Sequence, residues 1–479
     1  MTRGKTIRFT PADQRTFATL SGDFNPVHVD PIAARRIAAG EPIVHGMHLL
    51  LRMLDRHFTH ASTPPRALLA ATFLQPAFLN ESIQLDSDTD GTLWAHADGG
   101  VPLVSAHIRS APVLERAIVS FERGPRRSAS PVRIPNVWTL ADLDGQTGVI
   151  DLTATSRTAR AFPNLSRALG RDIGAAIAAI SRLVGMECPG HDSLLSALRL
   201  EIAPRTTVRR LAWRVTRVDR RFALVRIEVS SEAVSGTVDA FVRSQPAPPP
   251  LMRDAAARVA AGEFAGQRAL IVGGSRGLGA ATAMLIAAGG GLPIVTYATG
   301  AAEAAVLQHE ARAAGRRIDA LRLDVLDDNA GNVVAEAAAR AAATHVYYYA
   351  TPRIFARRRE PFDDRLFERF AAFYVTAFGR ICLSVARAIK PLDVFYPSST
   401  AVDETPPELT EYAAAKAAGE SLCRTLQRPD DGLRIHVRRL PRVKTDQTAS
   451  LLTVPALDPF DAALPIVREI QRSCAATTP

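Results

Sequence analysis

The apolar residues after Pro250 fall into short continuous runs that alternate with helical stretches. Six of these runs read RALIVGG from residue 268, LPIVTYA from 292, ALRLDV from 320, HVYYYA from 345, DVFYPSS from 393 and RIHVRRL from 434. Continuous apolar strands between helices are typical of a parallel sheet that is covered on both faces. This part of the chain is therefore predicted to be a doubly wound α/β domain.

The residues before Pro250 have a different pattern, in which one order of elements occurs twice. In each copy a short strand and a helix precede a long apolar helix, and four strands follow. The long helices are expected at 46–58 and 174–184, with following strands at 67–73, 82–86, 93–97 and 103–108, and at 194–202, 209–218, 223–229 and 236–242. An apolar helix wrapped by an antiparallel sheet, twice over, predicts an α+β double hotdog.

Two polar, proline-containing stretches suggest where the domains meet. SQPAPPP at 244–250 cannot continue a helix or a central strand, and GPRRSASPVRIP at 124–135 is rich in turn-forming residues. We therefore expect one hotdog repeat at 1–125, a second at 136–244, a linker at 245–262 and the α/β domain at 263–479.

Composition narrows the class of protein. Of the 479 residues 47% are hydrophobic, which excludes a disordered or fibrous chain. The net charge of +10 favours acidic partners, but aromatic residues make up only 6% and no basic run is interleaved with them. A phosphate-bearing cofactor or an acidic carrier protein could bind a basic protein as well as nucleic acid could. Because the basic residues are not interleaved with aromatic residues, no nucleic-acid partner is expected.

The sequence has no metal-ligand motif, no signal segment and no uninterrupted apolar span, and these absences predict the protein's location and metal content. The four cysteines show no metal-ligand spacing and are too few for a disulfide framework, so no metal and a reducing cytoplasm are expected. The N-terminal MTRGKTIRFT has no apolar signal core, and the most apolar long stretch, at 269–298, is interrupted by Arg276 and by glycines. We expect a soluble cytoplasmic protein without a membrane partner.

A first group of candidate chemical residues lies in SGDFNPVHVD at 21–30, followed by IVHGM at 43–47. This pattern resembles the MaoC-like (R)-specific enoyl-thioester hydratases. The resemblance implies that Asp23 and His28 hold the water that adds to a 2-enoyl thioester, one group taking a proton and the other delivering one. Gly46 would open the central helix, whose free N–H groups can polarise the thioester carbonyl.

The second repeat departs from this pattern. The segment that would carry the aspartate and the histidine is shorter, and no alignment places a histidine there. We therefore interpret the second repeat as a structural copy that supplies the partner sheet and part of an acyl tunnel.

A second group of candidate residues lies in the α/β domain. IVGGSRGLG at 271–279 follows a predicted strand and opens a helix, which is the arrangement that binds a pyrophosphate. Ser399 ends an apolar strand, and Tyr412 and Lys416 share one helix face at i and i+4. The set resembles the short-chain dehydrogenase/reductases, which have a Rossmann-type fold.

This resemblance implies roles for individual residues. Tyr412 would protonate a carbonyl oxygen, Lys416 would lower the tyrosine pKa and hold the nicotinamide ribose, and Ser399 would bind the substrate oxygen. The implied cofactor-binding residues are Gly273, Ser275, Arg276, Gly277, Leu278, Gly279, Asp324, Tyr412, Lys416 and Thr445.

Three departures from the reductase pattern keep a second interpretation open. The usual asparagine-rich turn reads Tyr348 to Thr351, the helix that normally supplies a fourth catalytic residue, an asparagine, reads Phe373, Tyr374, Val375, and Val272 replaces a threonine. The domain could therefore bind a cofactor without being active.

Together the two resemblances imply consecutive reactions. Reduction of a 3-oxoacyl thioester with NADP(H) yields the (R)-3-hydroxyacyl thioester that the other site dehydrates, on an acyl carrier protein or coenzyme A. NADPH is expected because no acidic residue ends the second strand, at Thr296 to Thr299, and Arg276 could bind the 2′-phosphate. The alternatives are a dehydratase with an inactive reductase domain, or a non-catalytic subunit that docks carrier proteins; a homodimer is a family expectation.

Overall fold

The computed structural model describes residues 5–37, 39–61, 65–110, 134–152, 154–204, 206–243, 245, 248–355, 362–427, 432–446 and 455–475. The chain divides into two compact units, one of residues 1–245 with 450–453 and one of residues 246–449 with 454–479. The stretch at 124–135, expected to separate the two repeats, lies largely outside the described residues, as do residues 244, 246 and 247 of the proline-rich stretch.

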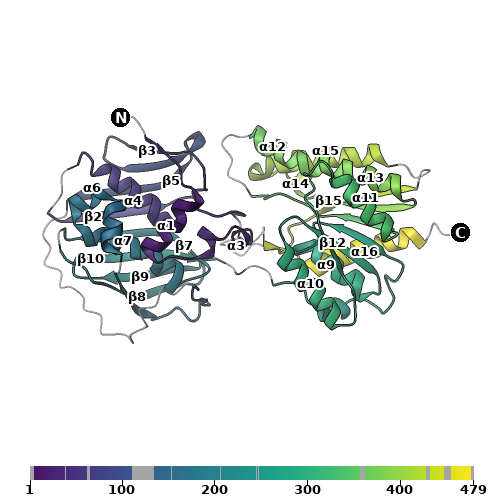
Figure 1. Ribbon diagram of the computed structural model, residues 1–479, viewed down its shortest axis with the longest axis horizontal. Coiled ribbons are helices and arrows are strands. Elements are labelled where there is room, and N and C mark those ends of the chain that lie inside the picture. The colour runs from purple at the N-terminus through teal and green to yellow at the C-terminus, as the bar shows by residue number, and fades with distance from the viewer. Residues whose placement is uncertain are drawn as a thin grey trace. The chain divides into compact units, whose positions relative to one another are not determined.

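The first unit contains a ten-stranded sheet in which the two repeats mirror each other (Figure 1). The strand order is β1-β3-β4-β5-β2-β7-β10-β9-β8-β6. The strands are β1 (Lys5–Ile7), β2 (Ala67–Phe73), β3 (Ile83–Ser87), β4 (Leu93–Ala97), β5 (Pro102–Ser110), β6 (Thr147–Asp151), β7 (Ser193–Ile202), β8 (Arg210–Asp219), β9 (Leu224–Ser230) and β10 (Val234–Val242). Antiparallel pairing of β2 with β7, from Ala67 opposite Ile202 to Thr72 opposite Ala197, joins the two halves into one sheet.

Two long apolar helices lie against this sheet, one from each repeat. They are α4 (Gly46–His57) and α7 (Arg171–Arg182), and α7 continues into the π-helical turn η2 (Leu183–Glu187). The shorter helices are α1 (Pro11–Ser21), α2 (Pro26–Val29), α3 (Pro31–Ala34), α5 (Thr155–Ala161), α6 (Pro163–Leu169) and η1 (Asp98–Gly100). The two helices contact each other, and one apolar core spans both repeats. The predicted double hotdog is confirmed, although the second long helix begins three residues earlier than expected.

The second unit contains a six-stranded parallel sheet of order β13-β12-β11-β14-β15-β16. The strands are β11 (Arg268–Val272), β12 (Leu292–Tyr297), β13 (Asp319–Arg322), β14 (His345–Tyr348), β15 (Leu392–Ser399) and β16 (Leu433–Leu440). The order reverses between β11 and β14, and in sheets of this type ligands bind at that point, beyond the carboxyl ends of the strands. The predicted doubly wound fold is confirmed.

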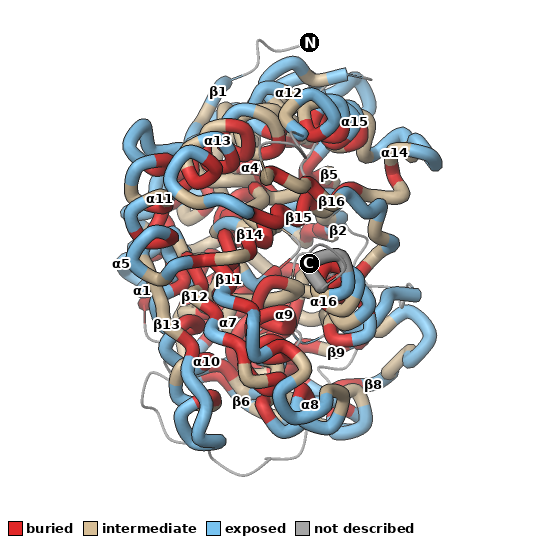
Figure 2. The backbone as a smooth tube through the Cα atoms, turned by 90° about the vertical axis from the view of Figure 1, so that its right-hand side faces the viewer, coloured by how far each residue is buried: buried red, intermediate tan, exposed pale blue. Residues whose placement is uncertain are grey.

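Helices cover both faces of this sheet, so its central strands β11, β14 and β15 are largely buried (Figure 2). The helices are α8 (Met252–Ala256), α9 (Gly277–Ala288), α10 (Ala301–Ala313), α11 (Ala330–Arg340), α12 (Asp364–Ala371), α13 (Phe378–Ala388), α14 (Ala401–Glu404), α15 (Thr410–Leu426) and α16 (Pro459–Ala475), with the turns η3 (Ala372–Ala377) and η4 (Pro407–Leu409). One core forms between the sheet and α9, α10 and α16, and another between the sheet and α11, α13 and α15. In β11, Ala269 and Ile271 belong to the first core and Leu270 and Val272 to the second. Because both faces of this strand are buried, its sequence is a continuous apolar run.

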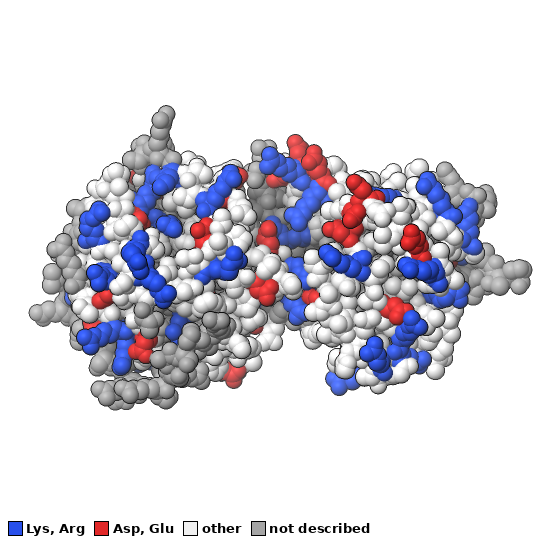
Figure 3. Space-filling view, viewed as in Figure 1, with Lys and Arg blue, Asp and Glu red and all other residues white. Residues whose placement is uncertain are grey.

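The distribution of surface charge and one long apolar helical stretch bear on which partners could bind. On the face drawn in Figure 3, basic side chains are spread over both units with acidic side chains between them. One continuous helical stretch, Asp364–Ala388, has the length and apolar composition of a membrane span, and half of its most apolar window is buried. Buried core helices meet the same criteria, and this one packs against α11 and α15.

Candidate active sites

The loop after α1 places Asp23 and His28. Helix α1 ends at Gly22, whose φ of 83° is a left-handed conformation that favours glycine and turns the chain sharply. Asn25 caps α2, because its side-chain oxygen accepts from the N–H of Val27. Its amide nitrogen donates to the carbonyl oxygen of Gly185, 2.8 Å away in the second repeat. Asn25 therefore fixes this loop to both repeats.

The carboxylate of Asp23 is almost completely buried and lies between the two repeats. Its Oδ2 accepts from the hydroxyl of Ser181 on α7 at 2.7 Å, and its Oδ1 accepts from the N–H of Asn25 at 3.1 Å. Burial raises the pKa of Asp23 above its usual value, while the charge of His28 and these hydrogen bonds oppose the rise. The group is therefore easier to protonate than an exposed aspartate.

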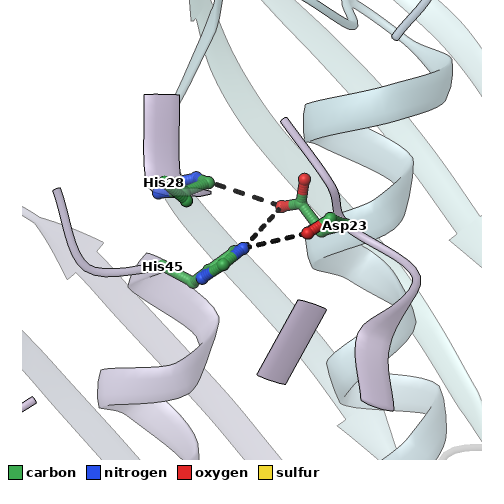
Figure 4. Close-up of side chains that lie close together, drawn as sticks. All are labelled: Asp23, His28 and His45. Atoms are coloured by element: carbon green, nitrogen blue, oxygen red, sulfur yellow. Dashed lines mark hydrogen bonds and ion pairs between the residues drawn. The ribbon is translucent and has the colours of Figure 1, made fainter. Parts of the chain in front are cut away.

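His28 faces Asp23 across a short gap (Figure 4). Its Nδ1 lies 2.8 Å from the carbonyl oxygen of Ile43, so Nδ1 donates and Nε2 presents a lone pair. Nε2 is 4.0 Å from Oδ2 of Asp23, which is too long for a hydrogen bond. At this distance both side chains can contact the oxygen atom of one water molecule. Burial lowers the pKa of His28, which favours the neutral base, although Asp23 opposes the shift.

His45 completes this cluster but is held by the protein. Its ring stacks on that of His28 at 3.8 Å between centroids. Nδ1 lies 2.7 Å from Oε1 of Gln14 and Nε2 lies 3.1 Å from the carbonyl oxygen of Asp23, so both ring nitrogens face protein acceptors. These contacts give His45 a structural role at the start of α4.

The same three residues could be considered as metal ligands, since their ligand atoms lie within 4.8 Å of one another. Both nitrogens of His45 and Nδ1 of His28 are already engaged. Only Nε2 of His28 and the carboxylate of Asp23 remain, which is fewer than the three protein ligands of a typical catalytic zinc site. The arrangement favours proton transfer over metal binding.

Asp23, His28 and Gly46 line one cavity of about 200 Å³. Gly46 begins α4, and a Cβ at this position would lie only 2.9 Å from ring carbons of Phe73. The remaining wall is mostly apolar and comes from both repeats, with Met47, Leu49, Phe73 and Val104 from the first and Val184, Leu194, Leu195 and Phe241 from the second. The cavity therefore has a polar end at the start of α4 and an apolar remainder.

Two residues of this site were missed in the sequence, Ser181 and Gly185. Both come from the second repeat, and a Cβ at Gly185 would overlap the carboxylate of Asp23. A serine within the apolar run GAAIAAIS was the available signal, since a polar residue on a buried helix face needs a partner. The copy expected to be structural thus contributes directly to the surroundings of Asp23.

In the second unit, the glycine turn has the shape of a phosphate-binding loop. Gly273 has φ of 78°, and a Cβ there would lie 2.7 Å from the backbone nitrogen of Ala350. A Cβ at Gly279 would lie 2.6 Å from the carbonyl oxygen of Gly273. Gly277 opens α9, Ser275 is nearly buried, and Leu278 packs on the core. The turn is therefore so tightly packed that a Cβ at Gly273 or Gly279 would overlap neighbouring backbone atoms.

Three other predicted cofactor residues lie at the carboxyl ends of the strands. Thr445 packs over Gly277, with its Cγ2 3.2 Å from the position that a Cβ would take. Arg276 precedes α9 and forms an ion pair with Asp446, with 3.6 Å between Nη1 and Oδ2. Asp324 follows β13, is exposed, and accepts from the N–H of Leu326.

Ser399, Tyr412 and Lys416 meet where β15 ends beside α15. Burial raises the pKa of Tyr412 to about 12, and a hydrogen bond with Ser399 opposes the rise. Nζ of Lys416 donates to the carbonyl oxygen of Pro397 at 2.6 Å. Burial lowers the pKa of Lys416 to about 7, so its charged form is marginal at neutral pH.

Comparisons with known proteins agree with this division. Residues 2–92 match the family model "MaoC like domain", and residues 267–453 match "short chain dehydrogenase". The chain is 33% identical over 94 residues to 3-hydroxyacyl-thioester dehydratase X of Mycobacterium tuberculosis, covering 20% of this chain and 30% of that protein. It is 55% identical over 42 residues to the (R)-specific enoyl-CoA hydratase of Aeromonas caviae, covering 9% and 31%. The matches thus span less than a third of either relative.

One of the matching solved structures is a 3-oxoacyl (acyl-carrier-protein) reductase from Agrobacterium tumefaciens. It is 21% identical, with 46% of this chain and 95% of that chain covered and a TM-score of 0.41. The family matches, the mirrored sheet and the parallel sheet lead to one conclusion. This chain joins a MaoC-like hotdog domain at its N-terminal end to a short-chain dehydrogenase domain at its C-terminal end.

Proposed function

We propose that the chain is a bifunctional enzyme of acyl-thioester metabolism. Its α/β domain reduces 3-oxoacyl thioesters to (R)-3-hydroxyacyl thioesters with NADPH, and its hotdog unit converts these reversibly to 2-enoyl thioesters. The observation that carries the proposal is the pairing of Asp23 with His28 at the polar end of an apolar cavity. The named activities of the two similar curated proteins, a thioester dehydratase and an enoyl-CoA hydratase, support the same chemistry.

In hydration, the two side chains divide the proton transfers. Nε2 of neutral His28 takes a proton from water as the water oxygen bonds to the β-carbon of the enoyl thioester. The carboxyl of Asp23 delivers a proton to the α-carbon, and a proton then returns from His28 to Asp23. The directions of both pKa shifts favour this starting state, because burial favours the neutral form of each group.

The start of α4 supplies the third requirement, stabilisation of the enolate. The first N–H groups of a helix have no partner within it, and the helix dipole is positive there. Gly46 gives close access to those groups, with Phe73 beside it. The thioester carbonyl would bind at this end while the acyl chain occupies the apolar part of the cavity.

The α/β domain fits a nicotinamide cofactor. Gly273 and Gly279 allow a tight turn in which a Cβ would overlap neighbouring backbone atoms, and this turn leads into a helix whose first N–H groups can bind phosphate. Ser275 to Gly279 would hold the pyrophosphate, with Thr445 beside the nicotinamide and Asp324 near the adenine. The bound cofactor supplies a hydride, and Tyr412 protonates the resulting oxygen while Ser399 orients it.

A shared intermediate links the two activities. The alcohol that the reductase forms is the substrate that the hotdog site dehydrates, and the carrier is coenzyme A or an acyl carrier protein. Such a sequence serves fatty-acid or polyketide-type metabolism. The second candidate is a dehydratase with an inactive reductase domain, which the absence of the usual asparagine around Phe373 to Val375 favours. The third is a non-catalytic subunit that docks carrier proteins.

Hydration of a short 2-enoyl thioester of coenzyme A tests the proposal. Asp23→Asn and His28→Ala should each lower the rate at least about a hundredfold, which is the contribution of one general acid or base. His107→Ala, at a partly exposed histidine on β5, is the matched control and should retain the parent rate. Full activity in both site variants would refute the dehydratase, and no activity in the parent would favour the non-catalytic subunit. Reduction of a 3-oxoacyl thioester that Tyr412→Phe abolishes would separate the bifunctional enzyme from the inactive domain.

A further inference from the structure

Three tyrosine rings surround the ammonium group of Lys416. Nζ lies 3.8 Å from the ring centroid of Tyr374, 5.1 Å from that of Tyr396 and 5.8 Å from that of Tyr412. All three distances are within the range in which a cation is attracted to an aromatic face. Lys416 itself is only 5% exposed, so this attraction is little screened by water.

Tyr374 is the ring nearest to Lys416, and it also contacts the predicted acid. Its ring meets that of Tyr412 edge-on, with 5.7 Å between centroids and 83° between planes. Its hydroxyl lies 2.5 Å from that of Thr351, which follows β14. Tyr374 thus lies beside two residues of the predicted reductase site, and its own orientation is held by a hydrogen bond.

The local backbone allows this close packing. Tyr374 belongs to the π-helical turn η3, a type of distortion that is frequent at functional sites. Gly419 on α15 faces the same region, and a Cβ there would overlap the hydroxyl of Tyr396 and lie 3.0 Å from the carbonyl oxygen of Tyr374. The absence of a side chain at Gly419 therefore lets η3 and β15 approach α15 around Lys416.

We infer that Tyr374 is a positioning residue of the reductase, whose ring holds Lys416 in its charged form beside Tyr412. This inference rests on the proposed reductase activity. Tyr374 lies in the stretch that supplies asparagine in similar enzymes, and Thr351 lies in the turn that is usually rich in asparagine. A hydrogen bond joins Thr351 to Tyr374, so the residues found in place of the two asparagine-containing segments contact each other. We interpret the two differences from similar enzymes as one coupled change.

The charge state of Lys416 depends on groups from several elements. The titratable or charged groups around it are Tyr374 from η3, Tyr396 from β15, Tyr412, Glu420 and Cys423 from α15, Cys382 from α13 near Cys423, and Arg439 from β16, which binds Glu420. Burial lowers the pKa of Lys416, whereas Glu420 and Cys423 raise it. An aromatic face acts in the same direction as these acids, because it favours the cation.

The pKa of Lys416 can be measured directly, because the chain has only four lysines, Lys5, Lys390, Lys416 and Lys444. Lysine labelled with ¹³C at the ε-carbon would give four NMR signals, and the one lost in Lys416→Arg belongs to Lys416. In Tyr374→Leu its pKa should fall by about 0.4–1.5, the range expected for one cation–π contact. In Tyr374→Phe, which keeps the ring, it should stay within about 0.3 of the parent value.

Reduction kinetics give the second readout. In Tyr374→Leu, kcat at pH 8 should fall about twofold to thirtyfold, the loss of charged Lys416 that this pKa change implies, and its alkaline limb should move to lower pH with Lys416. Tyr374→Phe should keep most of the parent rate. An unchanged or higher pKa of Lys416 in Tyr374→Leu would overturn the inference, as would equal loss of rate in both variants. A parent protein that reduces no 3-oxoacyl thioester would refute the proposed reductase, and the NMR titration would still decide whether Tyr374 holds the charge of Lys416.

Discussion

The hydroxyl of Ser181, on the long helix of the second repeat, donates to Oδ2 of Asp23, in the loop of the first, at 2.7 Å. This bond is made within the buried wall of the cavity and lowers the pKa of Asp23 against the effect of burial. The sequence places no histidine of the second repeat opposite His28, yet this repeat supplies a hydrogen bond that lowers the pKa of Asp23 in the first. The long helix of the second repeat therefore contributes to the site as well as to the core.

Replacing Ser181 by alanine should slow hydration by about tenfold to a hundredfold, because its hydroxyl stabilises the carboxylate that forms as Asp23 delivers its proton, and a hydrogen bond to a charged group contributes about 1.5–3 kcal/mol. Without the hydroxyl, the pKa of Asp23 should rise further, so the alkaline limb of the pH–rate profile should move to higher pH. Hydration rates of the purified protein across pH measure both effects.

Ser166→Ala is the matched control for this variant. Ser166 lies on α6 in the same repeat, and its hydroxyl is buried without a hydrogen-bond partner among the described residues. Its removal should leave the rate and the pH profile of hydration as they are. Equal losses in Ser166→Ala and Ser181→Ala would mean that the effect is one of general packing.

Gly185→Ala should abolish hydration without unfolding the protein, because a Cβ at this position would overlap the carboxylate of Asp23. Gly174→Ala is its control, since a Cβ on α7 at Gly174 would meet its nearest neighbours at an ordinary 3.6 Å. Alanine within a helix is also favoured over glycine by about 1 kcal/mol. Circular dichroism and the hydration assay together distinguish the two: activity retained in Gly185→Ala would show that Asp23 tolerates displacement.

The sequence predicted most of the fold because periodicity is a local property. The elements β2 and β4 lie at the predicted residues, and α4 ends one residue earlier than predicted, since an apolar helix and alternating strands are visible within ten residues. The contacts of Asp23 with Ser181 and Gly185 were not predictable in this way. They join residues about 160 positions apart, and only the packing of the two repeats brings them together.

The π-helical turns η2 and η3 were also missed, for a different reason. Such turns arise from a single extra residue within a helix and have no distinct apolar period. Both occur beside a candidate site, η2 at Gly185 and η3 at Tyr374. The sequence did reveal that asparagine was missing near Tyr374, but not that the tyrosine ring faces Lys416.

In the second unit, Arg276 and Asp446 lead to a prediction about the preference for NADPH over NADH. The ion pair between Arg276 and Asp446 places a guanidinium beside the glycine turn, where a 2′-phosphate would compete with the carboxylate. Arg276→Ala should weaken NADPH binding by about tenfold to a hundredfold and leave NADH binding nearly unchanged, whereas Asp446→Asn should tighten NADPH binding. Titration of both reduced cofactors measures the preference, with Arg268→Ala, at the opposite end of β11, as the control. Tighter binding of NADH by the parent, or an unchanged preference in Arg276→Ala, would refute this role.

The last prediction concerns acid stability and His48, which is buried on α4 and stacks on Phe17 at 4.5 Å between ring centroids. Burial lowers the pKa of His48 to about 3, whereas the unfolded chain has the ordinary value of 6.5. Below pH 6.5 the unfolded state therefore binds a proton that the folded state does not, and stability falls as the pH falls towards 3. At pH 5 the loss from this group is about 2 kcal/mol relative to pH 7.

His48→Phe should remove this part of the pH dependence while keeping an aromatic ring against Phe17. All three tryptophans, Trp94, Trp138 and Trp213, lie in the first unit, so their fluorescence in urea follows the unfolding of that unit within the full chain. Between pH 7 and pH 5 the free energy of unfolding should drop by about 2 kcal/mol less in His48→Phe than in the parent. The same drop in both proteins would show that His48 takes up a proton without unfolding, and that its ring is more accessible to water than its burial on α4 implies.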